Sequence, residues 1–242
     1  MFKNLNYNKL KIDKNRDYKL GVLFTIIPVV LFAAILCNKT MPAAEGWYTY
    51  YAQLINNGQV VYKDFEYLFM PGYITFIALF TKIFGYSIIA LRILGVIFFT
   101  IIAYLAYRIF NELFNPIAAC MGALVTAFYL QSEVVQIFYD YIRMMDIFAY
   151  LTIFLLIKMG KSFIAKEKPD IKITLLAGFS NAMVLMVKQN IGLLFGFFVL
   201  IYFIFLFVYA KEKKTVFLNL LYYGCGAAIV FAAYGIYLLA NG

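Results

Sequence analysis

The chain has 242 residues, of which 65% are hydrophobic and 14% are charged, and its formal net charge is +9. One soluble core could not bury so large an apolar fraction, so the composition predicts a membrane protein. Histidine is absent, which excludes His-based triads and most zinc sites, and the three cysteines, Cys37, Cys120 and Cys225, show neither paired nor metal-ligand spacing.

Seven apolar runs approach the roughly 20 residues that a helix needs to cross a bilayer. They are residues 20–37, 87–110, 116–132, 145–160, 172–188, 190–209 and 216–239. The sequence therefore predicts an all-α fold, a polytopic transmembrane helical bundle. The third and fifth runs are short, and at Lys188 the chain either makes a hairpin or breaks one longer helix. Ala33-Ala34 would suit a signal-peptide cleavage site, but the later spans favour a first run that stays in the membrane.

The basic residues indicate how the chain is oriented. With the N-terminus and the tail 1–19 in the cytoplasm, the lysines and arginines divide 15 against 6 between the cytoplasmic and outer sides, while the acids divide 6 against 6. Short cytoplasmic loops are enriched in Lys and Arg, so this division predicts a multi-pass protein of the cell membrane with a cytoplasmic N-terminus. Because the charge lies in loops and not in a stripe, nucleic acid is excluded as a partner.

The long external loop 38–86 lies between the first two runs. Residues 43–57 have helical character after Pro42, and Gly58 is a plausible terminator. Trp47, Tyr51 and Leu54 would share one face, which favours a helix lying flat at the outer membrane interface. Residues 71–84 predict either a second interfacial helix or the beginning of the next span.

Several short sequence elements follow one another along this loop and just after it, and one further element lies at the end of the fifth run. They are Glu45, Gly58, Tyr62-Lys63-Asp64, Pro71-Gly72, Gly85-Tyr86-Ser87, Arg92, and K-Q-N-x-G at Lys188 to Gly192. In this order and on one side of the membrane, they resemble the GT-C-type glycosyltransferases, specifically the bacterial relatives of protein O-mannosyltransferases and lipid A aminoarabinose transferases. The resemblance covers nearly the whole chain, and Ala44 stands where many relatives carry an aspartate.

The resemblance implies a single transmembrane glycosyltransferase-like domain over residues 1–242. The expected reaction transfers one hexosyl or pentosyl sugar from a polyprenyl-phosphate donor to a lipid, glycan or protein acceptor on the non-cytoplasmic face, in contact with membrane lipids. Members of the family are longer, with further spans and commonly a C-terminal extramembrane domain. We therefore expect a truncated gene, a fragment or a short relative.

Three acids are the candidate catalytic residues. Glu45 could accept the proton of the acceptor hydroxyl, or it could be a helix-start carboxylate favoured by the helix dipole. Asp64 lies in a loop with Tyr62, where carboxylates and aromatic rings suit sugar hydroxyls and ring faces; the alternative is a solvated loop acid. Asp140 could face the same external cavity as Glu45 or Asp64, or could pair locally with Arg143.

The candidate substrate-binding residues are mostly basic. Lys188 and Arg92 lie at the outer ends of spans, where they could bind and stabilise a lipid phosphate or could reach towards the interface as snorkelling side chains. Gln189 and Asn190 add hydrogen-bonding groups beside Lys188, and the set is completed by Tyr62 and Arg143.

The sequence predicts no metal site and no required cofactor, although oxygen ligands such as Asp64 could help hold a divalent cation. A competing interpretation is a transporter, flippase or lipid-binding membrane protein that uses the same cavity without bond chemistry. Transporters place functional polar groups near the bilayer midplane and often show related halves, and neither feature is evident here. An inactive truncated remnant is the third alternative.

Overall fold

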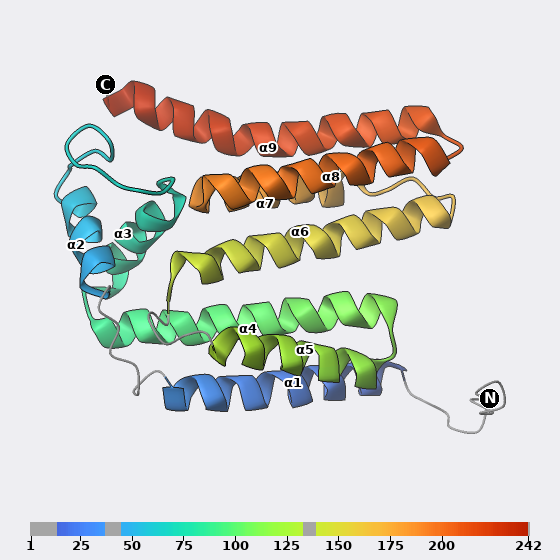
Figure 1. The fold of residues 1–242 in the computed structure, drawn as a ribbon, viewed down its shortest axis with the longest axis horizontal. Coiled ribbons are helices and arrows are strands. Elements are labelled where there is room, and N and C mark those ends of the chain that lie inside the picture. The colour runs from blue at the N-terminus through green and yellow to red at the C-terminus, as the bar shows by residue number, and fades with distance from the viewer. Residues whose placement is uncertain (1–13, 37–44, 133–138, 242) are drawn as a thin grey trace.

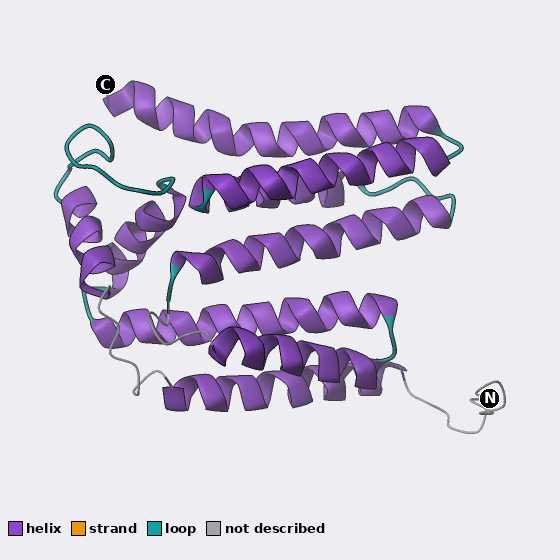
Figure 2. Cartoon of the chain, in the orientation of Figure 1, coloured by secondary structure: helices purple, strands orange, loops and turns teal. Residues whose placement is uncertain are grey.

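The computed structural model describes residues 14–36, 45–132 and 139–241. Over these ranges the helices are α1 (Lys14–Leu36), α2 (Glu45–Asn56), α3 (Gly72–Phe84), α4 (Ile88–Leu113), α5 (Pro116–Ser132), α6 (Tyr141–Ile164), α7 (Ile171–Val187), α8 (Gln189–Tyr209) and α9 (Lys213–Asn241). Figure 2 shows helices and loops, and no strand, in this part of the chain. The predicted all-α class is confirmed. The tail is described only from Lys14 onward, and Cys37 and Ala44 lie outside the described residues.

All seven apolar runs form helices, which lie side by side in Figure 1 with α2 and α3 across one end of the bundle. Helices α1, α4, α6, α8 and α9 are long and apolar enough to cross a membrane. Helices α5 and α7 have 17 residues each and are shorter than that requirement. The two runs predicted to be short are therefore the two short helices.

The bundle has two groups of helices joined by α6. Helices α1, α4 and α5 pack together around Phe99 and Ala103. Helix α7 packs on α6, and α8 and α9 pack on α7, so that the four helices share a core around Phe154, Met159 and Phe203. Many large apolar side chains on the outer faces are exposed, including Phe24 on α1 and Ile204 on α8. Such outward apolar faces are expected where lipid and not water is the surrounding solvent.

The connection at Lys188 is a hairpin. The single residue Lys188 joins α7 to α8, and the helices run back along each other, with Gly192 against Leu185 and Gly196 against Asn181. A side chain at position 192 would overlap the backbone of Leu185. The glycine of the K-Q-N-x-G element thus allows the two helices to approach closely at the turn.

The two ends of the bundle differ in the charge of their connecting segments. The α4–α5, α6–α7 and α8–α9 connections meet at the end opposite α2 and α3 (Figure 1). We call this the basic end, because it carries the lysine-rich segments 158–172 and 211–214. There Lys161 Nζ lies 2.7 Å from Glu112 Oε2, which ties α6 to α4. The α2–α3 end holds the candidate site.

Helix α2 agrees with the predicted 43–57 within two residues, and one of its faces packs against the rest of the bundle. Glu45, Tyr48 and Ala52 are buried, while Trp47 remains 68% exposed. Tyr51, expected on the same face as Trp47, instead packs into the core cluster of α2, α3, α4 and α6. Tertiary contacts therefore take Tyr51 towards the protein, and the position of this helix at the membrane interface stays a prediction.

Helix α3 is a separate helix, not the beginning of the next span. Gly72 begins it beside the end of α7, where a Cβ would lie 2.6 Å from the carbonyl oxygen of Met186. At its other end Gly85 adopts a φ of 78°, and Ser87 accepts a hydrogen bond from the amide of Ala90 to start α4. Asn56 of α2 donates to the Tyr86 hydroxyl at 2.9 Å. The Pro71-Gly72 and Gly85-Tyr86-Ser87 elements thus position the helices around the site.

Two glycines in α9 provide a matched test of this packing. A Cβ at Gly226 would overlap the carbonyl oxygen of Leu175 on α7, whereas a Cβ at Gly224 would meet nothing within 4 Å. We expect Gly226→Ala to lower stability by about 1–3 kcal/mol through overpacking, and Gly224→Ala to raise it by up to about 1 kcal/mol through helix propensity. Melting temperatures in detergent check both; equal effects would contradict the α7–α9 contact.

Candidate active site

Glu45 and Arg92 form a two-pronged ion pair between the start of α2 and the first turns of α4. Arg92 Nε donates to Glu45 Oε1 and Nη2 donates to Oε2, both at 3.0 Å. Glu45 is 6% exposed. Because both of its carboxylate oxygens accept from one guanidinium, neither oxygen is left without a donor.

Asp140 lies next to α2 and immediately before α6. Its Oδ1 accepts a hydrogen bond from the Tyr48 hydroxyl at 3.1 Å. The preceding Tyr139 is fully buried, and its hydroxyl donates to the backbone oxygen of Glu45 at 3.4 Å. The start of α6 is thereby attached to the first turn of α2, although 92 residues separate Tyr48 from Asp140.

The surroundings of Asp140 make it a better base than an ordinary carboxylate. Burial raises the pKa of Asp140, and this effect outweighs the opposing influence of the Tyr48 hydroxyl, the amides of Tyr141 and Ile142, and Arg143. Burial and the negative charge of Asp140 raise the pKa of Tyr48 well above its ordinary value, so its hydroxyl remains a donor. A carboxylate with a raised pKa is better matched to proton transfer near neutral pH.

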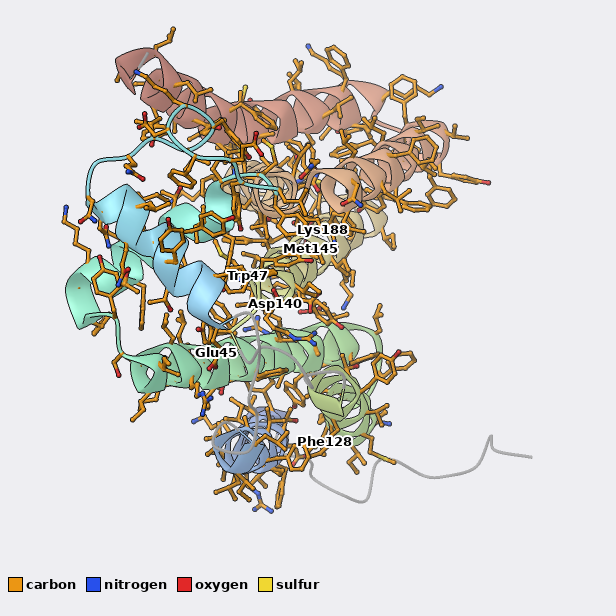
Figure 3. All side chains as sticks on the ribbon, turned by 60° about the vertical axis from the view of Figure 1, so that its left-hand side comes forward. Glu45, Trp47, Phe128, Asp140, Met145 and Lys188 are labelled. Atoms are coloured by element: carbon orange, nitrogen blue, oxygen red, sulfur yellow. The ribbon has the colours of Figure 1, made fainter. Side chains whose placement is uncertain are left out.

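Lys188 extends from the α7–α8 hairpin over an aromatic pair. Its Nζ lies 3.5 Å from the Tyr141 hydroxyl and 5.2 Å from the centre of the Tyr141 ring. The Tyr141 ring packs against Phe69 with a centroid distance of 4.5 Å. Tyr141 directly follows Asp140 in the chain, so the ring that Lys188 contacts belongs to the residue next to the carboxylate. Figure 3 shows Asp140 between Glu45 on one side and Lys188 on the other.

The two residues that follow Lys188 lie at the surface. Gln189 and Asn190 are exposed, and Asn190 Oδ1 accepts from the amide of Ile191 in the first turn of α8. Their predicted role in substrate binding stays a prediction, since the structure gives Asn190 a local role at the start of the helix.

Arg143 is held inside the bundle. It is 5% exposed, its Nη1 lies 3.1 Å from Asp146 Oδ2, and its guanidinium lies 5.4 Å from the ring centre of Phe99. The expected local ion pair is therefore present, with Asp146 and not Asp140 as the partner at that distance. Arg143 links α6 to α4 and supports the helix that begins at Asp140.

Asp64 and Tyr62 belong to an exposed loop. Asp64 Oδ2 accepts from the amide of Val60 at 2.7 Å, and this bond closes a tight turn. Tyr62 adopts a φ of 69° within the turn, and its hydroxyl donates to the backbone oxygen of Phe69. Burial of its hydroxyl raises the pKa of Tyr62 to about 12. Both residues shape the loop, which corresponds to the solvated-loop alternative for Asp64.

Among the predicted residues, the structure gathers Glu45, Arg92, Asp140 and Lys188 at the α2–α3 end and leaves Asp64 on the outer loop. Sequence reasoning gave no role to Tyr48, which contacts Asp140, or to Tyr141, which contacts Lys188. The Tyr139-Asp140-Tyr141 sequence was the available signal for Tyr141. Tyr48 gave none, because its partner lies 92 residues away.

No group of three or more Cys, Asp or Glu side chains suited to a metal ion occurs in the described ranges. The acids near the site are instead engaged by Arg92 and Tyr48. The expectations about metals and cofactors stay predictions.

The fold and the site define a multi-pass helical membrane protein with acidic, basic and aromatic side chains gathered at one end. A sequence model of the family described as dolichyl-phosphate-mannose-protein mannosyltransferase matches residues 70–237, which is more than half of the chain. The chain belongs to this family of membrane glycosyltransferases, in agreement with the resemblance found in the sequence. Neither curated proteins nor solved structures include a significant match.

The matched range bears on the candidate residues. Arg92, Asp140 and Lys188 lie inside residues 70–237, whereas Glu45 and Asp64 precede them. Among the three candidate acids, Asp140 alone is inside the matched segment.

The ion pair predicts how substitutions on α2 and α4 affect stability. Arg92→Met leaves the buried Glu45 carboxylate without its counter-charge, and Glu45→Met leaves the guanidinium without its partner, so we expect each to cost on the order of 3 kcal/mol. The double variant removes both charges and should recover much of the loss. Melting temperatures of the four proteins in detergent measure the coupling. Simple addition of the two single losses in the double variant would contradict the pair.

Proposed function

We propose that the chain transfers one sugar from a polyprenyl-phosphate donor to a hydroxyl group of an acceptor at the α2–α3 end, and that this end faces away from the cytoplasm. The observation that carries the proposal is the half-buried Asp140 carboxylate, hydrogen-bonded to Tyr48 and with its raised pKa, beside the Lys188–Tyr141 pair. The family supports glycosyl transfer in general. The sugar, the acceptor and the residue roles are the proposed part.

In the proposed reaction Asp140 accepts the proton of the acceptor hydroxyl while that oxygen attacks the anomeric carbon of the sugar. The bond between the anomeric carbon and the phosphate oxygen breaks, and the lipid leaves as polyprenyl phosphate. Lys188 supplies a positive charge for the phosphate oxygens before and after that bond breaks. The step is balanced without an oxidant, a reductant or a further co-reactant.

The structure supports Asp140 over Glu45 as the base. Both oxygens of Glu45 accept from Arg92, so an acceptor hydroxyl would have to displace the guanidinium to reach this carboxylate. The same ion pair commits Arg92 to α2, so we assign the donor phosphate to Lys188. Glu45 and Arg92 then position α2, on which Tyr48 reaches Asp140.

The separation of charge supports the proposed orientation. The lysine-rich segments 158–172 and 211–214 lie at the basic end, as far along the bundle as possible from α2 and α3 (Figure 1). Lys and Arg concentrate on the cytoplasmic side of membrane proteins. The α2–α3 end would then face the outside, where a lipid-linked sugar could reach it from the bilayer.

Turnover of a radiolabelled polyprenyl-phosphate sugar by the purified chain tests the function. Asp140→Asn should reduce the rate at least about 100-fold, because it removes the general base. Donor binding, measured separately, should survive. Asp64→Asn is the matched control, and its rate should stay near that of the wild-type protein. Donor binding without turnover by the wild-type protein would favour the non-catalytic alternative, and full activity of Asp140→Asn would reject Asp140 as the base.

The pH dependence of transfer tests the Tyr48 contact. The Tyr48 hydroxyl stabilises ionised Asp140, so Tyr48→Phe should raise the pKa of Asp140 further. A base acts only when deprotonated, and activity therefore rises as pH increases through its pKa. We expect the acidic limb of the rate profile to move to higher pH in Tyr48→Phe. Tyr50→Phe, an exposed position on the same helix, should leave that limb in place.

A further inference from the structure

A cavity of about 550 Å³ lies at the basic end, between the ends of α6 and α8 and the start of α9. This volume is within the range of small-molecule sites. Its walls are mostly apolar and aromatic and are formed by Phe163, Ile164, Tyr202, Phe205, Leu206 and Tyr209. None of these residues belongs to the candidate active site, which occupies the other end of the bundle.

The cavity is open towards the surroundings of the bundle. Ile164 is 84% exposed and Tyr209 is 72% exposed, and both lie in the last turn of a candidate membrane span. Aromatic side chains such as Tyr209 favour the level of the lipid headgroups. An occupant would therefore meet an apolar wall along the helices and a polar rim at the membrane surface.

The rim carries balanced charges from two connections. Lys166 and Glu167 come from the segment between α6 and α7, and Lys211 and Glu212 come from the segment between α8 and α9. All four are exposed. Glu212 keeps one carboxylate oxygen for an occupant, since the Thr215 hydroxyl donates to the other, Oε2, at 2.9 Å. Two cations and two carboxylates thus face the same opening.

Lys166 occupies a backbone position that usually belongs to glycine. Its φ is 59°, and it closes the end of α6, with its amide donating to the Phe163 oxygen and the Glu167 amide donating to the Ser162 oxygen. Glycine is favoured at such helix ends because it adopts the left-handed conformation without steric cost. Lysine at this position adds a charge to the cavity rim at the expense of backbone preference.

We propose that this cavity binds one phospholipid whose headgroup carries both a phosphate and a primary ammonium group, as in phosphatidylethanolamine. The phosphate lies between Lys166 and Lys211, the ammonium donates to Glu167 and Glu212, and an acyl chain covers the aromatic wall. Phosphatidylglycerol would bring a net negative charge beside two carboxylates, and its headgroup hydroxyls are neutral donors that supply no positive charge. A choline headgroup has no N–H to donate.

Native mass spectrometry of the full purified chain, titrated separately with phosphatidylethanolamine, phosphatidylglycerol and phosphatidylcholine of identical acyl chains, tests the proposal. We expect one saturable phosphatidylethanolamine molecule, bound at least about tenfold more tightly than the others. Lys166→Gly should weaken that binding about tenfold and leave the melting temperature unchanged or higher, because glycine suits the backbone. Lys168→Ala, in the same connection but outside the cavity lining, should bind as the wild-type protein does.

A second variant tests the headgroup assignment. Glu167→Gln removes one carboxylate from the rim, so the preference for phosphatidylethanolamine over phosphatidylglycerol should shrink. Equal binding of the three lipids to the wild-type chain would overturn the proposal, as would unchanged binding in Lys166→Gly. A second copy of the chain found in place of lipid would do the same. Sugar-transfer activity plays no part in these measurements, so their outcome is separate from that of the proposed function.

Discussion

The bidentate contact between Glu45 and Arg92 is the constraint on which the arrangement of the α2–α3 end depends. It fixes the first residue of α2 against α4, with both charges largely removed from solvent. A buried charge without its partner is costly, so the position of α2 cannot slide without separating the pair. Once α2 is fixed, Tyr48 comes within hydrogen-bonding distance of Asp140, and Tyr139 reaches the backbone of Glu45. The geometry around Asp140 is thus a consequence of an ion pair formed by two other residues.

The aromatic side chains complete this arrangement by replacing water around the acids. Tyr48, Tyr73 and Tyr139 pack edge to face, and all three are buried. The Tyr73 hydroxyl donates to the backbone oxygen of Tyr139, so the segment before α6 is attached to α3 as well as to α2. Removing water from Asp140 raises its pKa. The same removal of water strengthens every electrostatic contact in the site.

Much of the fold could be predicted from the sequence, because long apolar runs bounded by polar residues have few alternatives to a membrane helix. The hairpin at Lys188 could not, because a one-residue connection is compatible with a turn or with a broken helix until the contact of Gly192 with Leu185 is known. The packing of Tyr51 and Tyr48 of α2 against the rest of the site was not predicted, since three-dimensional partners and not aromatic content decide it. The roles of Glu45 and Arg92 depend on a contact across 47 residues, which single-residue reasoning could not detect. The end of α2 near Gly58 was predictable, because Gly58 has a φ of 89°, a local backbone conformation that glycine adopts more readily than other residues.

The proposed base, Asp140 immediately before α6, would also account for a departure that the sequence presents on its own. The family resemblance of the sequence leads one to expect an aspartate where this chain has Ala44, directly before Glu45. An acid that replaces this aspartate as the base must lie at the same end of the bundle, and its affinity for a proton must suit the reaction. Glu45 meets the first condition but is committed to Arg92, and Asp64 lies on an exposed turn that its own carboxylate closes. Asp140 meets both conditions, and it lies within the segment that matches the family. The change at Ala44 is therefore compatible with retained transfer chemistry, provided that α2 supplies Tyr48 and the base comes from the start of α6.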